Sequence, residues 1–467
     1  MTKPISRTLF DLLAIGTRLS FTRVVSEECS WWSDLDDQVL GAVVLDKTDR
    51  DYGWIMLIRD LVGRFRCVDL EVSLPSERAA TARLRLAIAA KSRDRRFRGF
   101  EAQGGEPNYT LDLFEDRGVP EDRLHKYYLE LRDNISRSPA KKVLQAISPW
   151  LITSDAHLVK EFQEAHFDQR LWEIYLWAMF RDQGYDVEHR EAPDLRVTSP
   201  WHAFSVEATT VAPSTSGPLA DHPNPNPSSE EEMEDFIRHY MPMKFGSSLV
   251  SKLNKTDAQG RHYWELPGVE NLPFVLAIAD FHKQADGDTP ASMTYSQGGL
   301  YVYLYGSRAS ANLEDGKFVV REEPVPLHTY KGKTVPSGFF DLPGAENVSA
   351  VLFSNAGTIS KFERLGVLAG FAPAGHKYIR IGHLFDPDPN AYVGIPFSVD
   401  VSDSTYEEFW GDEVQVFHNP RALRPISPEA FPDAANFLYE QEKVITFDRP
   451  GRVLSSLTMI LRPRPDG

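Results

Sequence analysis

Residues 193–210 have the sequence PDLRVTSPWHAFSVEATT, which predicts two short β-strands joined by a turn. Each strand carries one acid among apolar neighbours: Asp194 begins the first strand, and Glu207 lies near the end of the second. Burying an unpaired carboxylate costs several kcal/mol. We therefore expect a cation between these two acids, and a metal ion would account for both.

The segments around this stretch predict an α/β core. A long helix is expected over residues 154–185, ending at Gly184, and it carries Glu173 on a largely apolar surface. Three extended runs follow, then a Pro- and Ser-rich loop at 212–235 and a helix containing MKFGSSLVSKLNK, residues 243–255. The apolar run LPFVLAIADF, residues 272–281, is typical of a buried central strand.

The 467 residues are too many for one ordinary core, so three parts are predicted. Residues 1–150 form an N-terminal α+β module, and residues 151–300 form the α/β core, with a mixed sheet flanked by helices. Residues 301–467 form a β-rich C-terminal extension, with GLYVYLYG at 299–306 expected as one of its strands. In this extension, SNAGTISKFERLG, residues 354–366, is expected as a strand-to-helix turn; phosphate binding by its backbone is the alternative.

Composition restricts the possible partners and the compartment. A net charge of −16 argues against a protein that binds nucleic acid over its whole surface, but it allows a local basic groove. The basic stretch at residues 83–98 is either the solvated side of an amphipathic helix or such a surface. No apolar run approaches the roughly 18 residues of a membrane span. With only two cysteines, Cys29 and Cys67, the chain is expected to be cytoplasmic.

Three acids form the candidate chemical site: Glu173, Asp194 and Glu207. Such carboxylates repel one another unless a divalent cation screens them, and oxygen ligands suit Mg²⁺ or Mn²⁺. The alternative is that the strand Asp caps a turn and that a buried Glu pairs with an arginine, such as Arg170 or Arg196. The sequence has no Walker A loop, GxGxxG, HExxH or GxSxG motif and no zinc-type Cys/His cluster. These absences argue against a nucleotide-driven motor, a dehydrogenase, a zinc protease and an α/β-hydrolase.

A helix Glu (Glu173), then Pro193–Asp194, then a strand Glu (Glu207) resembles the PD-(D/E)XK, or restriction-endonuclease-like, nuclease superfamily. The resemblance covers roughly residues 155–285 and implies a restriction-endonuclease-like fold. It implies that Asp194 and Glu207 bind Mg²⁺ or Mn²⁺ and that Glu173 supports the site. The family carries a lysine two positions after the strand Glu, where this chain has Thr209.

The helix that contains residues 243–255 offers replacements for the missing lysine. Lys252 is the favoured candidate, ahead of Lys255, because it lies nearer the middle of the helix. The alternative is that these lysines form only the solvated side of an amphipathic helix.

The resemblance implies a Mg²⁺-dependent endonuclease, and DNA is the expected substrate because most members of the superfamily cut DNA. Bacterial defence or repair is the biological setting that the resemblance suggests. A protein partner or a second copy of the chain is left open. The first alternative is a catalytically inactive nuclease fold that serves as a binding or assembly module. The second is a glycosidase that uses Glu173 and Glu207.

Overall fold

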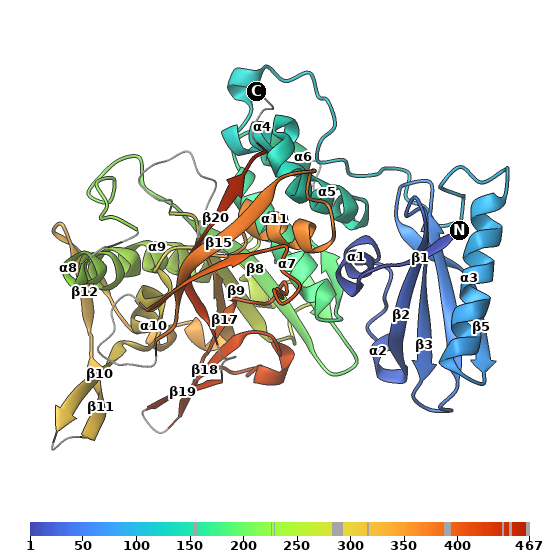
Figure 1. Cartoon of the computed structure of the whole chain (residues 1–467). Coiled ribbons are helices and arrows are strands. Elements are labelled where there is room, and N and C mark those ends of the chain that lie inside the picture. Colours follow the sequence, from blue (N-terminus) through green and yellow to red (C-terminus); the bar gives the residue numbers. More distant parts are fainter. Residues whose placement is uncertain are drawn as a thin grey trace.

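An antiparallel sheet of five strands forms the N-terminal part of the chain, at the right of Figure 1. The computed structural model describes the chain except residues 153–156, 226, 228, 283–292, 315–316, 387–393, 441–442, 448–450 and 464–467. The strands are β1 (Thr2–Pro4), β2 (Ser26–Asp34), β3 (Val39–Asp46), β4 (Tyr52–Arg59) and β5 (Phe65–Leu74).

Two helices cover this N-terminal sheet. Helix α3 (Glu77–Arg93) packs Leu84 and Ile88 on one face, and α1 (Arg7–Leu13) packs Phe10 on the other; the short α2 (Thr22–Val25) leads into β2. The basic stretch that begins at residue 83 therefore lies largely on α3, an amphipathic helix with its apolar side against the sheet.

A mixed sheet of eight strands forms the centre of the molecule, in the order β19-β18-β17-β14-β9-β8-β7-β6. Strands β8, β9 and β14 are parallel neighbours, whereas β6, β7 and β8 pair antiparallel. The strands are β6 (Asp186–His189), β7 (Leu195–Thr198), β8 (Ala203–Val211), β9 (Phe274–Asp280), β14 (Ala350–Ser354), β17 (Gln415–His418), β18 (Ala435–Glu440) and β19 (Lys443–Phe447). Because four of them come from residues 301–467, the sheet continues across the boundary expected at residue 300.

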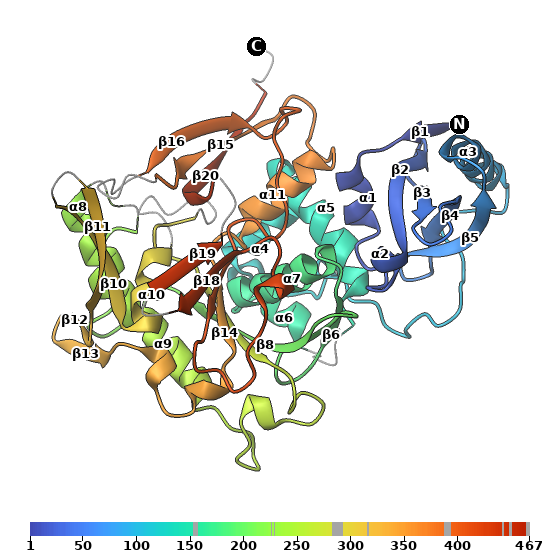
Figure 2. The same ribbon diagram turned by 90° about the horizontal axis from the view of Figure 1, so that it is seen from below.

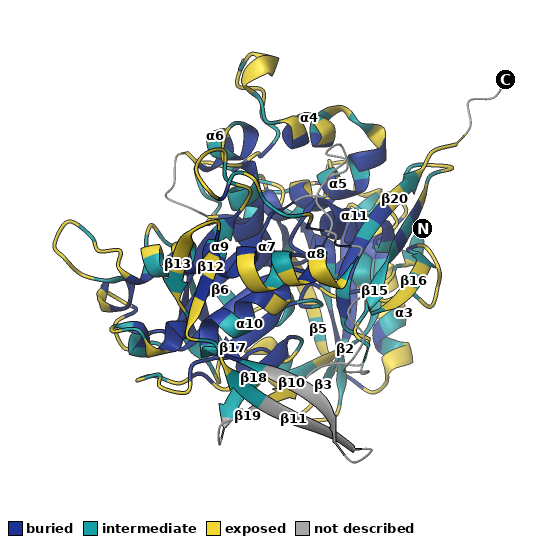
Figure 3. Ribbon diagram, turned by 90° about the vertical axis from the view of Figure 1, so that its left-hand side faces the viewer, coloured by how far each residue is buried: buried dark blue, intermediate teal, exposed yellow. Residues whose placement is uncertain are grey.

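Helices cover both faces of the central sheet (Figure 2). One layer comprises α4 (Lys126–Asp133), α5 (Ser138–Ile147), α6 (Leu158–Gln163), α7 (Phe167–Asp182) and α11 (Ile359–Leu368). The other comprises α9 (Met241–Leu253) and α10 (Gln297–Tyr305), preceded by α8 (Glu230–Glu234) and a π-helical turn, Asp235–Tyr240. Helix α7 is mostly buried, as the dark blue ribbon of Figure 3 shows. The expected α/β class, with a mixed sheet flanked by helices, is confirmed.

The remaining strands form smaller sheets around this core. Strands β15 (Lys377–Leu384), β16 (Ile395–Asp400) and β20 (Val453–Leu461) form a three-stranded sheet. Strands β10 (Ser307–Glu314) and β11 (Lys317–Pro324) form one hairpin, and β12 (Leu327–Tyr330) and β13 (Lys333–Pro336) form another. No helix among the described residues is both long and apolar enough to cross a membrane.

Two expectations about secondary structure are wrong. The single helix expected over 154–185 is two helices, α6 and α7, separated at residues 164–166. The segment GLYVYLYG is not a strand: it lies in α10, which ends at Gly306 in the left-handed conformation. Its Val and Tyr residues favour a strand by composition, but Gly299 lets α10 approach the carbonyl oxygen of Ile237 so closely that an added Cβ would lie 2.6 Å from it.

The segment at 354–366 places charged side chains in the interior. Lys361 and Arg364 on α11 are buried and form ion pairs with Glu408, at 2.9 and 2.7 Å, and Lys361 also pairs with Glu413. Arg380 of β15 joins the same cluster through Glu413, at 2.9 Å. These cations are already paired with buried carboxylates, so the ion pairs connect α11 and β15 to the segment that contains Glu408 and Glu413.

Candidate functional site

The antiparallel pairing of β7 with β8 places Asp194 beside Glu207. Leu195 is opposite Val206, so Asp194, the residue before β7, is level with Glu207. The backbone N–H of Ala208 donates a hydrogen bond of 2.6 Å to Oδ2 of Asp194. Glu207 is only 4% exposed. The two acids expected at this sheet therefore lie together.

Helix α9 brings a cation to these acids. The ammonium of Lys252 donates to Oε1 of Glu207 over 2.5 Å. One turn earlier on the same helix, Oγ of Ser248 lies 2.8 Å from Oγ1 of Thr209. Residues two apart on a strand face the same side, so Glu207 and Thr209 both meet α9. The structure thus places Lys252 against the carboxylate, while Lys255 forms no ion pair with a described carboxylate.

Glu173 is held by its own helix. Arg170 donates to Oε2 of Glu173 over 2.6 Å, and Gln169 donates to Oε1 over 3.2 Å. Arg170 also pairs with Glu161. Burial raises the pKa of Glu173, although Arg170 opposes that shift. The alternative of arginine pairing therefore holds for Glu173, which is not in hydrogen-bond contact with the Asp194–Glu207 pair.

The charges of Glu207 and Glu173 nevertheless act on the carboxyl group of Asp194. Burial raises the pKa of the Asp194 carboxyl well above its ordinary value, and the charges of Glu207 and Glu173 raise it further. The N–H of Ala208 and the ammonium of Lys252 act in the opposite direction. Burial and the two neighbouring acids therefore both favour the protonated form of Asp194.

Two further residues of the site carry no signal in the sequence. Tyr263, in a 3₁₀ turn after α9 (Tyr263–Glu265), lies near Glu207; burial and that carboxylate raise the pKa of its phenol. The ammonium of Lys252 lies 5.9 Å from the centre of the Tyr263 ring. Burial, and then the charge of Arg170, lower the pKa of His189 on β6 to about 4, so its imidazole is neutral at pH 7. Tyr263 lies far from the acids in sequence, and His189, although only five residues before Asp194, belongs to no motif that marks it, so the tertiary structure identifies both.

The Asp194–Glu207 pair could supply two carboxylate ligands to a magnesium or manganese ion. In the described part of the chain, no three His, Cys, Asp or Glu residues are grouped so that they could hold a metal ion alone. Magnesium, however, is commonly bound by one or two protein carboxylates, with water and substrate phosphates as the remaining ligands. Asp194 and Glu207 supply two carboxylates, and the charge of Glu207 is, after burial, the main cause of the raised pKa of Asp194. Glu173, with both oxygens engaged, would support the pair from α7.

A cavity of about 500 Å³ opens beside this pair, and Thr209 and Lys252 belong to its wall. A ligand in this cavity would therefore meet the ammonium of Lys252. Comparisons of the chain with protein-family models, with curated proteins and with solved structures find no match.

Proposed function

We propose that this chain is a metal-dependent nuclease of the PD-(D/E)XK kind that hydrolyses phosphodiester bonds, with DNA as the expected substrate. The observation that carries the proposal is the 2.5 Å contact between Lys252 and Glu207 beside Asp194. It supplies, from a helix, the ammonium that the family carries on the strand where this chain has Thr209. The element order α7-β6-β7-β8-α8-α9-β9, a helix and three strands followed by further helices and a strand, is compatible with the restriction-endonuclease-like assignment.

In this proposal, Asp194 and Glu207 hold Mg²⁺ or Mn²⁺. The bound ion supplies Lewis-acid activation and neutralises charge on the phosphate. Lys252 has three N–H donors, of which one is directed to Glu207, so the others can orient water and donate to a phosphate oxygen. Lys252 forms an ion pair with Glu207, and Tyr263 lies near that carboxylate. Arg170 keeps Glu173 in place behind the pair.

A second candidate function is a binding module with a nuclease-like core and no hydrolysis. The observation that favours it is the same ion pair, because Lys252 already compensates the charge of Glu207 without a metal ion. The glycosidase alternative has no such support: both oxygens of Glu173 accept hydrogen bonds from Arg170 and Gln169, so this carboxyl is not free to act on a sugar.

Cleavage of plasmid DNA and of short single-stranded DNA tests the proposal. The protein is assayed with Mg²⁺, with Mn²⁺ and with a chelator, as wild type, Asp194→Asn and Glu207→Gln. Glu188→Gln is the matched control, because Glu188 is an acid on the neighbouring β6 whose partners are Arg190 and Arg196. We expect cutting that requires the ion, is retained by the control and falls at least about 100-fold in the two site variants.

Two results would contradict the proposal. Cutting that persists in chelator would show that no metal ion is required, and equal activity of Glu207→Gln and wild type would place the chemistry elsewhere. If the wild type binds DNA, does not cut it and shows no heat of Mg²⁺ or Mn²⁺ binding by calorimetry, the binding-module alternative is the better description.

A further inference from the structure

The cavity beside the acids is built around one face of α9. Lys244, Ser247, Ser248, Ser251 and Lys252 recur at the three- and four-residue spacing that places side chains on one side of a helix, and all five line the cavity. The rest of the lining comes from the end of β8, from the segment that follows it, which includes Ser214, and from Lys333 of β13. We call this cavity the α9 groove.

The α9 groove is cationic in a chain whose net charge is −16. Three lysines line it, and none of the described lining residues is Asp or Glu. Lys244 donates to Oγ of Ser214 over 2.7 Å, and Lys333 is exposed. Burial lowers the pKa of Lys244; the charge of Asp280 opposes this shift, and the charge of Lys333 adds to it. Among the described residues, neither forms an ion pair with a carboxylate.

Clustered lysines with hydroxyl donors between them, and without acids, are suited to an anion with several phosphates. Lys252 and Lys244 mark two ends of the groove along α9. Eight residues of helix, at about 1.5 Å each, separate them by about 12 Å. A stacked nucleic-acid strand rises about 3.4 Å per phosphate, so this length matches three to four phosphates.

We propose that the α9 groove binds the phosphates of a nucleic-acid strand next to the phosphodiester that is cut at Asp194 and Glu207. This inference rests on the proposed nuclease function for the position of the cut. Lys252 lies where the α9 groove meets the acid pair, since it contacts Glu207 and also lines the groove. Lys244 and Lys333 bind the flanking phosphates, and Ser247 and Ser251 donate further hydrogen bonds to them.

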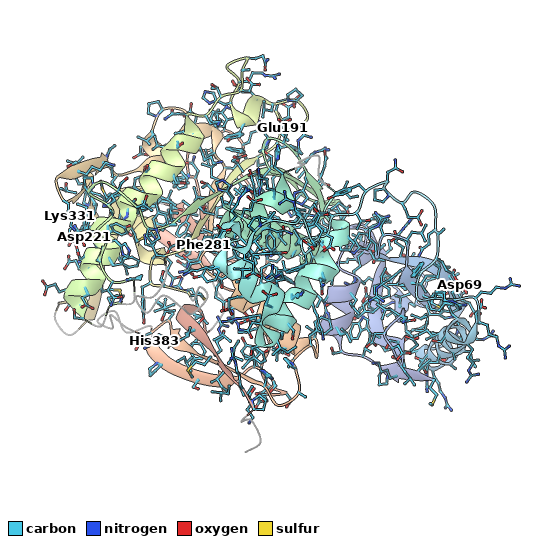
Figure 4. All side chains as sticks on the ribbon, turned by 90° about the horizontal axis from the view of Figure 1, so that it is seen from above. Asp69, Glu191, Asp221, Phe281, Lys331 and His383 are labelled. Carbon is cyan, nitrogen blue, oxygen red and sulfur yellow. The ribbon has the colours of Figure 1, made fainter. Side chains whose placement is uncertain are left out.

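Binding measured without catalysis tests the groove. Fluorescence anisotropy of a labelled single-stranded oligonucleotide is recorded in chelator at several salt concentrations, for the wild type and for the double variant Lys244→Gln/Lys333→Gln. The matched control is Lys255→Gln/Lys331→Gln, which removes the same charge. Lys255 follows the end of α9, and Lys331 pairs with Asp221 at the tip of the β12–β13 hairpin (Figure 4). Circular dichroism confirms that each variant is folded.

For the groove variant we expect a Kd at least about tenfold higher than that of the wild type, at equal salt. The slope of log K against log salt should become shallower by about 0.7 for each lysine removed. The control should keep the wild-type slope. A groove variant that matches the control, or a wild type that binds no oligonucleotide, would overturn the inference.

The same samples, with Mg²⁺ in place of chelator, separate this inference from the proposed function. If the wild type cuts DNA while the groove variant binds like the control, the nuclease remains and the groove inference fails. If the groove variant loses binding and the wild type does not cut, the groove binds nucleic acid and the nuclease proposal fails.

Discussion

Replacing Lys252 by methionine removes the ammonium and keeps an apolar chain of similar length. Glu207 then loses an ion pair of 2.5 Å, and Asp194 loses the positive charge that opposes its raised pKa. The carboxylates of the site remain buried without their nearest cation. The variant therefore tests how much of the stability of this site depends on one side chain.

The structure sets the size of the effect between two limits. Breaking a fully buried ion pair by removing one partner costs about 3–5 kcal/mol, whereas exposed pairs contribute about 0–1 kcal/mol. The Lys252 side chain is 23% exposed and that of Glu207 is 5% exposed, so the pair is mostly but not fully buried. We expect the free energy of unfolding in chelator to fall by about 2 kcal/mol.

The response to Mg²⁺ distinguishes this site from an ordinary ion pair. Lys252 and a metal ion compete for Glu207, so the variant should bind Mg²⁺ more tightly and gain more stability from it than the wild type does. Thermal unfolding in chelator and in increasing Mg²⁺ measures both effects, with Lys255→Met as the control. DNA cleavage by the variant should fall about 100-fold, because a donor to the reacting phosphate is lost.

Unchanged stability in chelator, together with an unchanged response to Mg²⁺, would refute this account of Lys252. A loss of stability with no change in the Mg²⁺ response would leave Lys252 as a structural ion pair only.

Three other predictions concern neighbouring features. In the background of Lys252→Ala, Thr209→Lys should restore part of the lost DNA cleavage, because a lysine at 209 faces α9 as Glu207 does; no gain would indicate that the two positions are not equivalent. Asp194→Asn should raise the free energy of unfolding in chelator. Because the folded-state pKa of Asp194 is raised, its contribution to the free energy of unfolding falls as the pH rises from about 4. Urea titrations should therefore show that the difference in the free energy of unfolding between the variant and the wild type grows from pH 4 to pH 7; a shrinking difference would contradict the prediction. Gly299→Ala should lower the free energy of unfolding by about 1–3 kcal/mol, and with it the melting temperature, because the new Cβ would lie 2.6 Å from the carbonyl oxygen of Ile237. An unchanged melting temperature would show that the helices can separate.

Local patterns in the sequence predict the part of the sheet that carries the acids. The three extended runs after residue 185 are β6, β7 and β8, and the apolar run at 272–281 contains β9, whose residues are all buried. Strand alternation also places Glu207 and Thr209 on one face. These features depend on residues close together in the chain, so periodicity and turn residues are sufficient to identify them.

Features that depend on distant pairing could not be predicted in this way. Strands β14 and β17 join the central sheet through partners that no local pattern specifies. Helix α10 has the composition of a strand, and its close packing against α9 and the π-helical turn, in a buried cluster, accompanies its helical conformation. Tyr263 reaches Glu207 only because a turn after α9 returns to the sheet. The pairing of Glu173 with Arg170, three residues earlier on α7, could be anticipated as one of two alternatives, but the sequence did not decide between them.

Under the proposed function, Thr209 and Lys252 together take the place of the lysine that the family carries two positions after the strand Glu. Threonine at 209 is short enough to leave room for α9 and polar enough to bind Ser248, and this hydrogen bond fixes the helix against β8. Lys252 follows Ser248 by one helical turn, on the same side, so fixing Ser248 also fixes the direction of the ammonium toward Glu207. A lysine on the strand would need no such support, whereas a lysine on a helix does. Loss of the Thr209–Ser248 contact should therefore weaken the Lys252–Glu207 pair, although neither Thr209 nor Ser248 carries charge.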